Sequence, residues 1–497
     1  MSEAMPTTEL AKVTGTRPYA SSLVADGGAA YFLARRGRDK LVGSVGRTKI
    51  AGRQVGELDG KPVVVGPADH ANAAAIRQAL PWTAPRTIGL ATSAGLGDRM
   101  GLATPGHVRA IRGTGVTPVF AQQSIREMTR TGRTPDEVMD CATWGVLQEG
   151  WRSGFGSDAD HLQKPQDIDA TVAAGFTMFT IDPGPHVDND ADKLDAAGLA
   201  EKYAALDFPT LEISPVDLRA AYAGRSFSLK GGGRIALDEA AMLRAAVKYG
   251  NAIAHTARMF RHLSDAAKGE YELEVSVDET DSPTSQAEHY FFAAELKRLG
   301  VKWVSMAPRF IGRFEKGVDY IGDTDAFARS FAGHVAVMRT LGPYKMSIHS
   351  GSDKFSIYPI VSQISEGLVH LKTAGTSYLE ALRAIAEIDP ALFREILDFA
   401  RQRYETDKAT YHVSADVGKV PAASGLADKD LPGLLDEFDA RQALHVTFGS
   451  VLTADGGRRF RIRIIAALDG AEETHYQVLQ RHLRRHIQPF ARPGAAG

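Results

Sequence analysis

The runs YELEVSV (residues 271–277), VKWVSMAP (301–308) and YKMSIHS (344–350) are short and rich in apolar residues, as buried strands are. Between them lie TSQAEHYFFAAELKRLG (284–300) and DTDAFARSFAGHVAVMRTLGP (323–343), in which apolar residues recur at helical spacing until a glycine stops the pattern. A series of strand, helix, strand, helix and strand predicts a parallel sheet with right-handed crossovers.

Five more segments have the same strand character. They are TIGLATS (87–93), TPVFAQQ (117–123), GFGSDADHL (154–162), FTMFTID (176–182) and GLVHLKT (367–373). Together with the first three they make the eight strands of a (β/α)8 barrel. We therefore predict an α/β fold of the TIM-barrel type, and a doubly wound open sheet is the alternative.

The barrel is predicted to occupy residues 86–455. Residues 1–85 contain many glycines and short strand-like pieces, so we expect an N-terminal cap or small subdomain there. Residues 456–497 are expected to form a C-terminal appendage of strand and helix. Within the barrel region, SLKGGGR (228–234) has glycines but lacks the strand-to-helix context of a phosphate-binding loop.

Composition and charge narrow the class of protein and its partners. Lys plus Arg number 58 and Asp plus Glu number 60, so the net charge of -2 gives no overall reason to expect nucleic acid or an anionic membrane as a partner. No apolar run is long enough to span a bilayer, and the first residues lack the pattern of a secretory signal. We expect a cytoplasmic protein that acts on a small molecule, with a homo-oligomer left open.

Polar residues gather where the predicted strands end, which is where active sites of this fold are built. His349 ends one strand, and Lys354 lies in the loop that follows it. Asp160 and His161 end another strand, and an acid beside a histidine suits either a metal ligand or a proton-transfer pair. A polar loop with a helix-capping aspartate is the alternative for that second pair.

The strand at 271–277 carries acidic residues in an alternating pattern. Glu272, Glu274 and Ser276 fall on one face, with Asp278 next in the alternation, and the apolar residues fall on the other face. In a barrel the polar face points inward, where an ionised carboxylate needs a metal, a cation or a substrate hydroxyl as partner. The pattern alone does not separate Glu274 from Asp278 as the functional group.

Three further positions are candidates. Asp182 ends a strand, although an aspartate before a turn also serves local hydrogen bonding. Arg309 and Glu315 follow the strand at 301–308, and a guanidinium there suits a substrate carboxylate or phosphate. His445 lies among apolar residues, which favours a core histidine whose hydrogen bonds are satisfied.

Histidines and carboxylates at different strand ends fit one oxygen and nitrogen site for a divalent cation: Zn²⁺, Mn²⁺, Fe²⁺, Co²⁺ or Ni²⁺. Cys141 is the only cysteine, so a thiolate-rich site is excluded. Such a metal polarises carbonyl and hydroxyl oxygens while a carboxylate moves a proton. Isomerases, epimerases and aldolases of sugars use this chemistry.

Six ordered strings resemble the tagaturonate epimerase family. They are DADHLQK (158–164), GFTMFTIDPGPHV (175–187), LEVSVDETDSPT (273–284), APRFIGRFEKGVDYIGD (307–323), YKMSIHSGSDKFSIYP (344–359) and LHVTFGSVL (444–452). The resemblance implies a metal-dependent epimerase that interconverts D-tagaturonate and D-fructuronate, or the neutral ketohexoses tagatose and fructose at C4.

The resemblance also implies roles for individual residues. Asp160 is the proton acceptor and Glu274 the proton donor. His161, His349 and Glu315 hold the metal, although Asp319 is an alternative to Glu315. The remaining implied contacts, to substrate hydroxyls or carboxylate, come from Asp182, Arg309 and Lys354.

Two other functions compete with this one. A metal-dependent aldolase or sugar isomerase would use the same scaffold and the same enediolate chemistry. A non-catalytic sugar-acid binding protein would bind the ligand without metal.

Overall fold

The computed structural model describes residues 7–492, and its centre is a closed barrel of eight parallel strands. In chain order these are β7 (Ser93–Gly95), β8 (Thr117–Ser124), β9 (Gly156–Leu162), β10 (Met178–Ile181), β13 (Glu272–Val277), β14 (Ser305–Pro308), β15 (Lys345–Ile348) and β16 (Val369–Lys372). Each strand pairs with the next one round the barrel, and β16 pairs with β7 to close it. The predicted (β/α)8 fold is confirmed.

One predicted strand is displaced. The segment 87–93 was expected to be extended, but β7 begins only at Ser93. The chain turns before that point at Gly89, whose φ of 59° lies in the left-handed region. The backbone N–H groups of Ile88 and Gly89 donate to the carboxylate of Glu272, at the start of β13. Glu272 therefore lies at the amino end of its strand and binds this turn.

Helices cover the outside of the barrel. They are α3 (Thr104–Ile111), α4 (Ile125–Thr131), α5 (Pro135–Glu149), α6 (Pro165–Ala173), α10 (Glu239–Ala266), α11 (Gln286–Arg298), α12 (Thr324–Leu341), α13 (Tyr358–Ser365) and α14 (Thr376–Ile388). Local sequence sets their ends: Ser285 and Glu288 form a capping box at the start of α11. The apolar face of β13, with Leu273 and Val275, is buried in the core that these helices share with the barrel.

An insertion between β10 and β13 lengthens one side of the barrel. It contains α7 (Ala196–Ala204), α8 (Phe208–Leu211), α9 (Pro215–Tyr222), β11 (Arg225–Ser228) and β12 (Arg234–Leu237). The glycines of SLKGGGR form the tip of the β11–β12 hairpin, where Gly231, Gly232 and Gly233 all have positive φ. They make a turn, so they bind no phosphate in the manner of a strand-to-helix loop.

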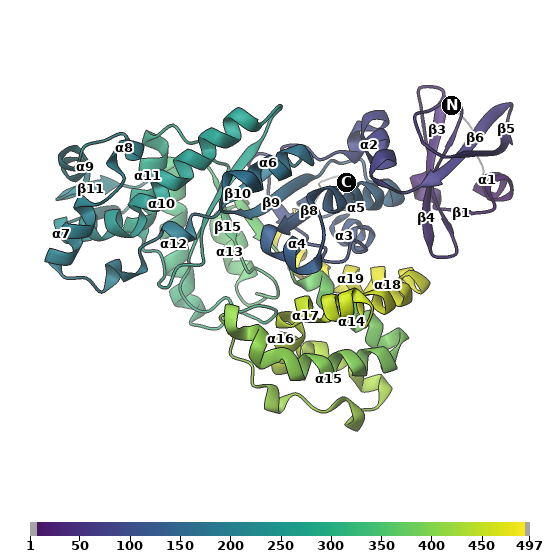
Figure 1. Cartoon of the computed structure of the whole chain (residues 1–497). Helices are drawn as coiled ribbons and strands as arrows, with labels where there is room; N and C mark the ends of the chain where they lie inside the picture. Colours follow the sequence, from purple (N-terminus) through teal and green to yellow (C-terminus); the bar gives the residue numbers. More distant parts are fainter. Residues whose placement is uncertain (1–6, 493–497) are drawn as a thin grey trace.

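The N-terminal part is a small antiparallel sheet with two helices. Its elements are α1 (Thr7–Thr14), β1 (Arg17–Pro18), β2 (Val24–Asp26), β3 (Ala29–Arg36), β4 (Asp39–Val45), β5 (Arg53–Leu58), β6 (Lys61–Pro67) and α2 (His70–Ala79). Figure 1 shows this sheet in purple at one end of the molecule, opposite the end that carries α7, α8 and α9. Arg35 and Tyr19 both bind Glu472, which ties the sheet to the C-terminal helices.

The C-terminal helices form a layer of their own. They are α15 (Pro390–Asp407), α16 (Phe438–Val446), α17 (Phe448–Thr453), α18 (Arg461–Gly470) and α19 (Glu472–Ile487). With α14 they enclose a second apolar core, which contains residues on both sides of position 455. Figure 1 shows these helices in green and yellow, with α14 to α17 below the barrel strands. Among residues 7–492, no helix has the length and hydropathy that crossing a membrane requires.

Candidate active site

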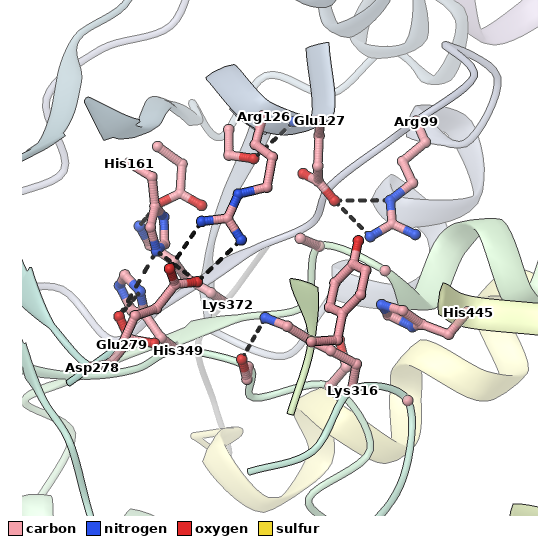
Figure 2. A pocket seen from close by; sticks show the side chains of 18 of the residues that line it. Arg99, Arg126, Glu127, His161, Asp278, Glu279, Lys316, His349, Lys372 and His445 are labelled. Atoms are coloured by element: carbon pink, nitrogen blue, oxygen red, sulfur yellow. Dashed lines mark hydrogen bonds and ion pairs between the residues drawn. The ribbon is translucent and has the colours of Figure 1, made fainter. Parts of the chain in front are cut away.

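Two adjoining cavities open at the carboxyl ends of the barrel strands. The inner cavity has a volume of 70 Å³ and the outer one 310 Å³. Residues that line both are Arg126, Asp278, Glu279, Lys316, His349, Ser350 and Tyr411. Figure 2 shows the inner cavity from close by; on one side it labels His161, His349, Asp278 and Glu279.

Asp160, His161 and His349, which the sequence singled out, lie together in the inner cavity. One donor atom from each lies within 4.8 Å of the others, and the two imidazole ring centres are 5.2 Å apart. His161 has a positive φ of 56°, at a point where the pairing of β9 with β10 is irregular. This distortion turns successive side chains out of the usual alternation, so that Asp160 and His161 both face the cavity.

Hydrogen bonds to carboxylates hold both histidines. His161 Nδ1 lies 2.8 Å from Asp160 Oδ1, and His349 Nε2 lies 2.6 Å from Glu274 Oε1. Burial alone would lower the pKa of His161, but the charge of Asp160 raises it to about 10. Burial and Lys372 act to lower the pKa of His349, and Asp278 and Glu274 outweigh them, raising it to about 9.

Lys372, which the sequence pattern did not single out, supplies the positive charge that the buried carboxylates need. Its Nζ lies 2.8 Å from Asp158, 2.7 Å from Asp160 and 2.7 Å from Glu274, and it also donates to Thr180 Oγ1. Burial would lower the pKa of Lys372, but the three carboxylates raise it well above its ordinary value. The residue stands on β16, and the inward alternation of His370 and Lys372 is the signal that would have found it.

The same contacts decide which acids are ionised. Burial raises the pKa of each carboxyl, but Lys372 and the histidines hold the pKa values of Asp160 and Glu274 well below their ordinary range. For Asp158, burial prevails over Lys372 and the pKa rises to about 6. Asp160 and Glu274 therefore carry negative charge at neutral pH.

Glu274 and Asp278 differ in position. Glu274 is fully buried behind His349, accepts a hydrogen bond from Ser305, and lines neither cavity. Asp278 lines both cavities, and its Oδ1 lies 3.3 Å from His349 Nδ1. Asp278 therefore lies at the surface of the cavity, whereas Glu274 lies behind that surface.

Glu315 lies apart from the histidine pair. Its carboxylate accepts hydrogen bonds from Ser414 and Gln442 and lines only the outer cavity. Among the described residues, Glu315 belongs to none of the groups whose donor atoms could share an ion, whereas Asp182 and Glu279 form such a group with His161.

The two predicted substrate-binding cations occupy different places. Arg309 lines the outer cavity. Lys354 lines neither cavity, since its buried Nζ donates to the backbone carbonyls of Glu315, Val318 and Ser352. Burial lowers the pKa of Lys354 to about 7. Its contacts hold the loop after β15 against the loop after β14.

His445 differs from its expected role as a satisfied core residue. It stands on α16 and is buried, as predicted. However, neither ring nitrogen has a hydrogen-bond partner within residues 7–492, and the side chain lines the inner cavity. Burial and the nearby cations Arg99 and Lys316 hold its pKa well below its ordinary value, so the imidazole is neutral.

Comparison with known proteins agrees with this geometry. A family model described as tagaturonate epimerase matches residues 19–490. The chain is 44% identical over 419 residues to a tagaturonate/fructuronate epimerase of Thermotoga maritima, covering 84% of this chain and 85% of that one. The structure is also similar to a crystal structure of the fructuronate-tagaturonate epimerase UxaE of Cohnella laeviribosi complexed with one glycerol. The TM-score is 0.91 and the sequence identity 35%, and the match covers 97% of this chain and 98% of that chain.

The native crystal structure of the same Cohnella enzyme gives a TM-score of 0.90 at 35% identity, over 97% of this chain and 99% of that one. The family match covers all of the residues that build the barrel strands and line the two cavities. The chain therefore belongs to the tagaturonate epimerase family.

Proposed function

We propose that this chain interconverts D-tagaturonate and D-fructuronate, two ketouronates that differ at one hydroxyl-bearing carbon. The family and its relatives make the chain an isomerase of the epimerase type. The observation that carries the proposal is the convergence of Asp160, His161 and His349 at the carboxyl end of the barrel, in a chain that resembles these epimerases over most of its length.

We further propose that one divalent cation takes part. The donor set of Asp160, His161 and His349 fits such an ion, because one carboxylate oxygen and two imidazole nitrogens can reach a common point. Glu274, bonded to the far nitrogen of His349, is the kind of outer partner that orients a ligating histidine. When bound, the cation would polarise a carbonyl and an adjacent hydroxyl of the substrate.

The protein's own groups would hold and move the protons. Asp160 is ionised and faces the cavity, which supports a role as proton acceptor for the carboxylate oxygen that the cation would leave free. Of the two carboxylates that the sequence left open as donor, Asp278 lines the cavity and Glu274 lies behind His349. This arrangement supports Asp278 as the group next to the substrate and Glu274 as the group that positions His349.

The epimerised carbon is β to the ketone, so direct enolisation does not make its hydrogen acidic. In one route, Asp160 accepts the proton of the hydroxyl on that carbon, and the bond to the α carbon breaks to give an aldehyde and an enediolate. The aldehyde rotates, the bond forms again on its other face, and the proton returns to the new hydroxyl. The alternative is a sequence of enolisations, in which solvent deuterium must enter the product.

An assay on metal-stripped protein tests the proposal. Fructuronate and fructose are offered separately, divalent cations are added back one at a time, and products are separated by chromatography. We expect epimer formation only after a cation is restored, with fructuronate as the better substrate. If no epimer forms from either sugar with any cation, the proposed reaction is refuted; if cleavage products accumulate, the aldolase alternative gains support.

A further inference from the structure

The cations around the inner cavity are mostly matched by carboxylates of the protein. Arg99 binds Glu127 at 2.7 Å, Arg126 binds Glu279 at 2.9 Å, and Lys372 lies against three acids. A cation that is already paired gains little from a negatively charged ligand, because its charge is largely neutralised. Recognition of a substrate carboxylate therefore calls for a cation of another kind.

Lys316 is such a cation. It lies in the loop after β14 and lines both cavities. Its Nζ donates a 2.6 Å hydrogen bond to the hydroxyl of Ser350, the residue after His349. No carboxylate in the part of the chain that the structure describes lies within ion-pair distance of this ammonium group.

The position of Lys316 suits the far end of a six-carbon substrate. Figure 2 shows Lys316 and His445 across the inner cavity from His161 and Asp278, with the Lys316 amino group directed into the space between. A ketouronate carries its carboxylate two bonds beyond the epimerised carbon. A substrate whose reacting carbon lies beside Asp160 and the histidines would thus direct its carboxylate toward another part of the cavity wall.

His445 adds a second observation at the same end. Its buried, neutral ring has no hydrogen-bond partner among residues 7–492. A buried polar group without a partner costs free energy, and a bound acceptor close to it recovers part of that cost. At this end of the cavity, therefore, His445 has no hydrogen-bond partner and Lys316 has no carboxylate partner among the described residues.

We propose that Lys316, with the hydroxyl of Ser350, binds the substrate carboxylate and makes the enzyme prefer sugar acids over neutral ketoses. This inference rests on the proposed function for its substrate class. Arg309, the other predicted cation for the substrate acid, lines only the outer cavity. Lys316 instead lines both cavities, and its ammonium group would make a charge-assisted contact with the carboxylate of a substrate bound beside the histidines.

Steady-state kinetics of Lys316→Met test the proposal. We expect KM for fructuronate to rise roughly 10- to 100-fold, the worth of one charge-assisted hydrogen bond, while kcat changes little. Turnover of fructose should be unaffected. Lys316→Gln is the second variant should the methionine variant fold poorly, and Lys302→Met, an exposed position ahead of β14, is the matched control.

Binding measurements separate this inference from the proposed reaction. Calorimetry compares a six-carbon aldonate with the matching alditol, and needs no turnover. We expect the wild-type protein to prefer the acid and Lys316→Gln to lose that preference. The inference is overturned if the wild-type protein binds acid and alditol equally, if the variant keeps its preference, or if the variant loses activity on acid and neutral sugar alike.

Discussion

At the scale of single residues, the site depends on two acids whose sequence context is nearly the same. Glu274 and Asp278 lie four residues apart, yet one is sealed behind His349 and the other lines the cavity. The difference arises because β13 ends at Val277, so that Asp278 already belongs to the loop beyond the strand. Both acids contact His349, so the roles proposed for them differ because only Asp278 reaches the cavity.

Glu274→Gln and Asp278→Asn separate these tasks. We expect Asp278→Asn to lower kcat by about 10²- to 10⁴-fold at saturating metal, as the loss of a proton-transfer group does. Glu274→Gln should instead weaken metal affinity about 10- to 100-fold, as the loss of a carboxylate behind a ligating histidine does. Metal titrations followed by activity assays measure both quantities. Should Glu274→Gln abolish kcat at saturating metal while Asp278→Asn leaves it intact, Glu274 is itself the donor.

Sequence reasoning located the acid and the histidines but not their counter-charge. Asp160 and His161 lie near the carboxyl end of β9 and His349 directly follows β15, and the barrel rule alone predicts that such residues converge. Lys372 also ends a strand, but its meaning depends on Asp160, which lies 212 residues away. Alternation tells which face a side chain occupies, and it does not tell which partner lies across the barrel.

At the scale of elements, helix α19 anchors the loop that follows His349. Asp353 in that loop binds His482 at 2.6 Å and Arg441 at 2.9 Å, and its backbone N–H donates to His486. Arg441 also binds Glu380 on α14 at 3.0 Å. This buried network joins α14, α16 and α19 to the loop after β15.

Arg441→Met should destabilise this arrangement. Burial raises the pKa values of Asp353 and Glu380, but Arg441 and His482 more than offset it, so both pKa values are lowered. Removing the guanidinium leaves buried charge uncompensated, which costs about 3–5 kcal/mol of unfolding free energy at pH 7. Denaturant unfolding measures this loss, and unchanged stability would show that the network contributes nothing.

The same variant should change the dependence of stability on pH. A carboxyl whose pKa is lowered by folding contributes stability above its unfolded pKa and loses it as pH falls toward the folded value. The wild-type protein should therefore lose stability as pH falls below about 4.5, the ordinary value for Glu380. In Arg441→Met the pKa values of Asp353 and Glu380 in the folded protein rise. The unfolding free energy should therefore fall less steeply as the pH is lowered over that range.

Elements were easier to predict than their ends. The helices at 284–300 and 323–343 carry caps and stop signals in the chain itself, and they form close to where those signals lie. The strand expected at 87–93 moved because its apolar residues flank a turn at Gly89 that Glu272 holds. That contact comes from a distant part of the chain and leaves no mark in local periodicity.

At the scale of the whole molecule, buried ion pairs connect the last barrel strand, β16, to other strands of the barrel. Lys372 on β16 reaches Asp160 on β9 and Glu274 on β13, so one ammonium group joins three separated strands inside the barrel. The buried Lys345 on β15 is a natural comparison, since its Nζ binds only the hydroxyl of Ser93 among the described residues. Burial lowers the pKa of Lys345 to about 8.

Replacing each lysine by methionine tests this difference. We expect Lys372→Met to lower the unfolding free energy by about 3–5 kcal/mol, because three buried acids lose their counter-charge. Lys345→Met should cost less than about 1.5 kcal/mol, since a similar apolar side chain replaces a desolvated ammonium group that pairs with no carboxylate among the described residues. Thermal and denaturant unfolding measure the stability of both variants. Equal losses of unfolding free energy would contradict the view that Lys372 is the counter-charge of the three buried acids.

The seam between β7 and β16 has a consequence for biosynthesis. Ser93 and His370, which bond across that seam, lie 277 residues apart, and the loop after His349 is held by His482 and His486. A ribosome therefore extrudes seven strands with an exposed edge before the eighth can cover it, and further helices must follow before the loop after His349 is held. Until then the nascent chain offers unpaired strands and apolar surface, the features that attract chaperones and invite aggregation.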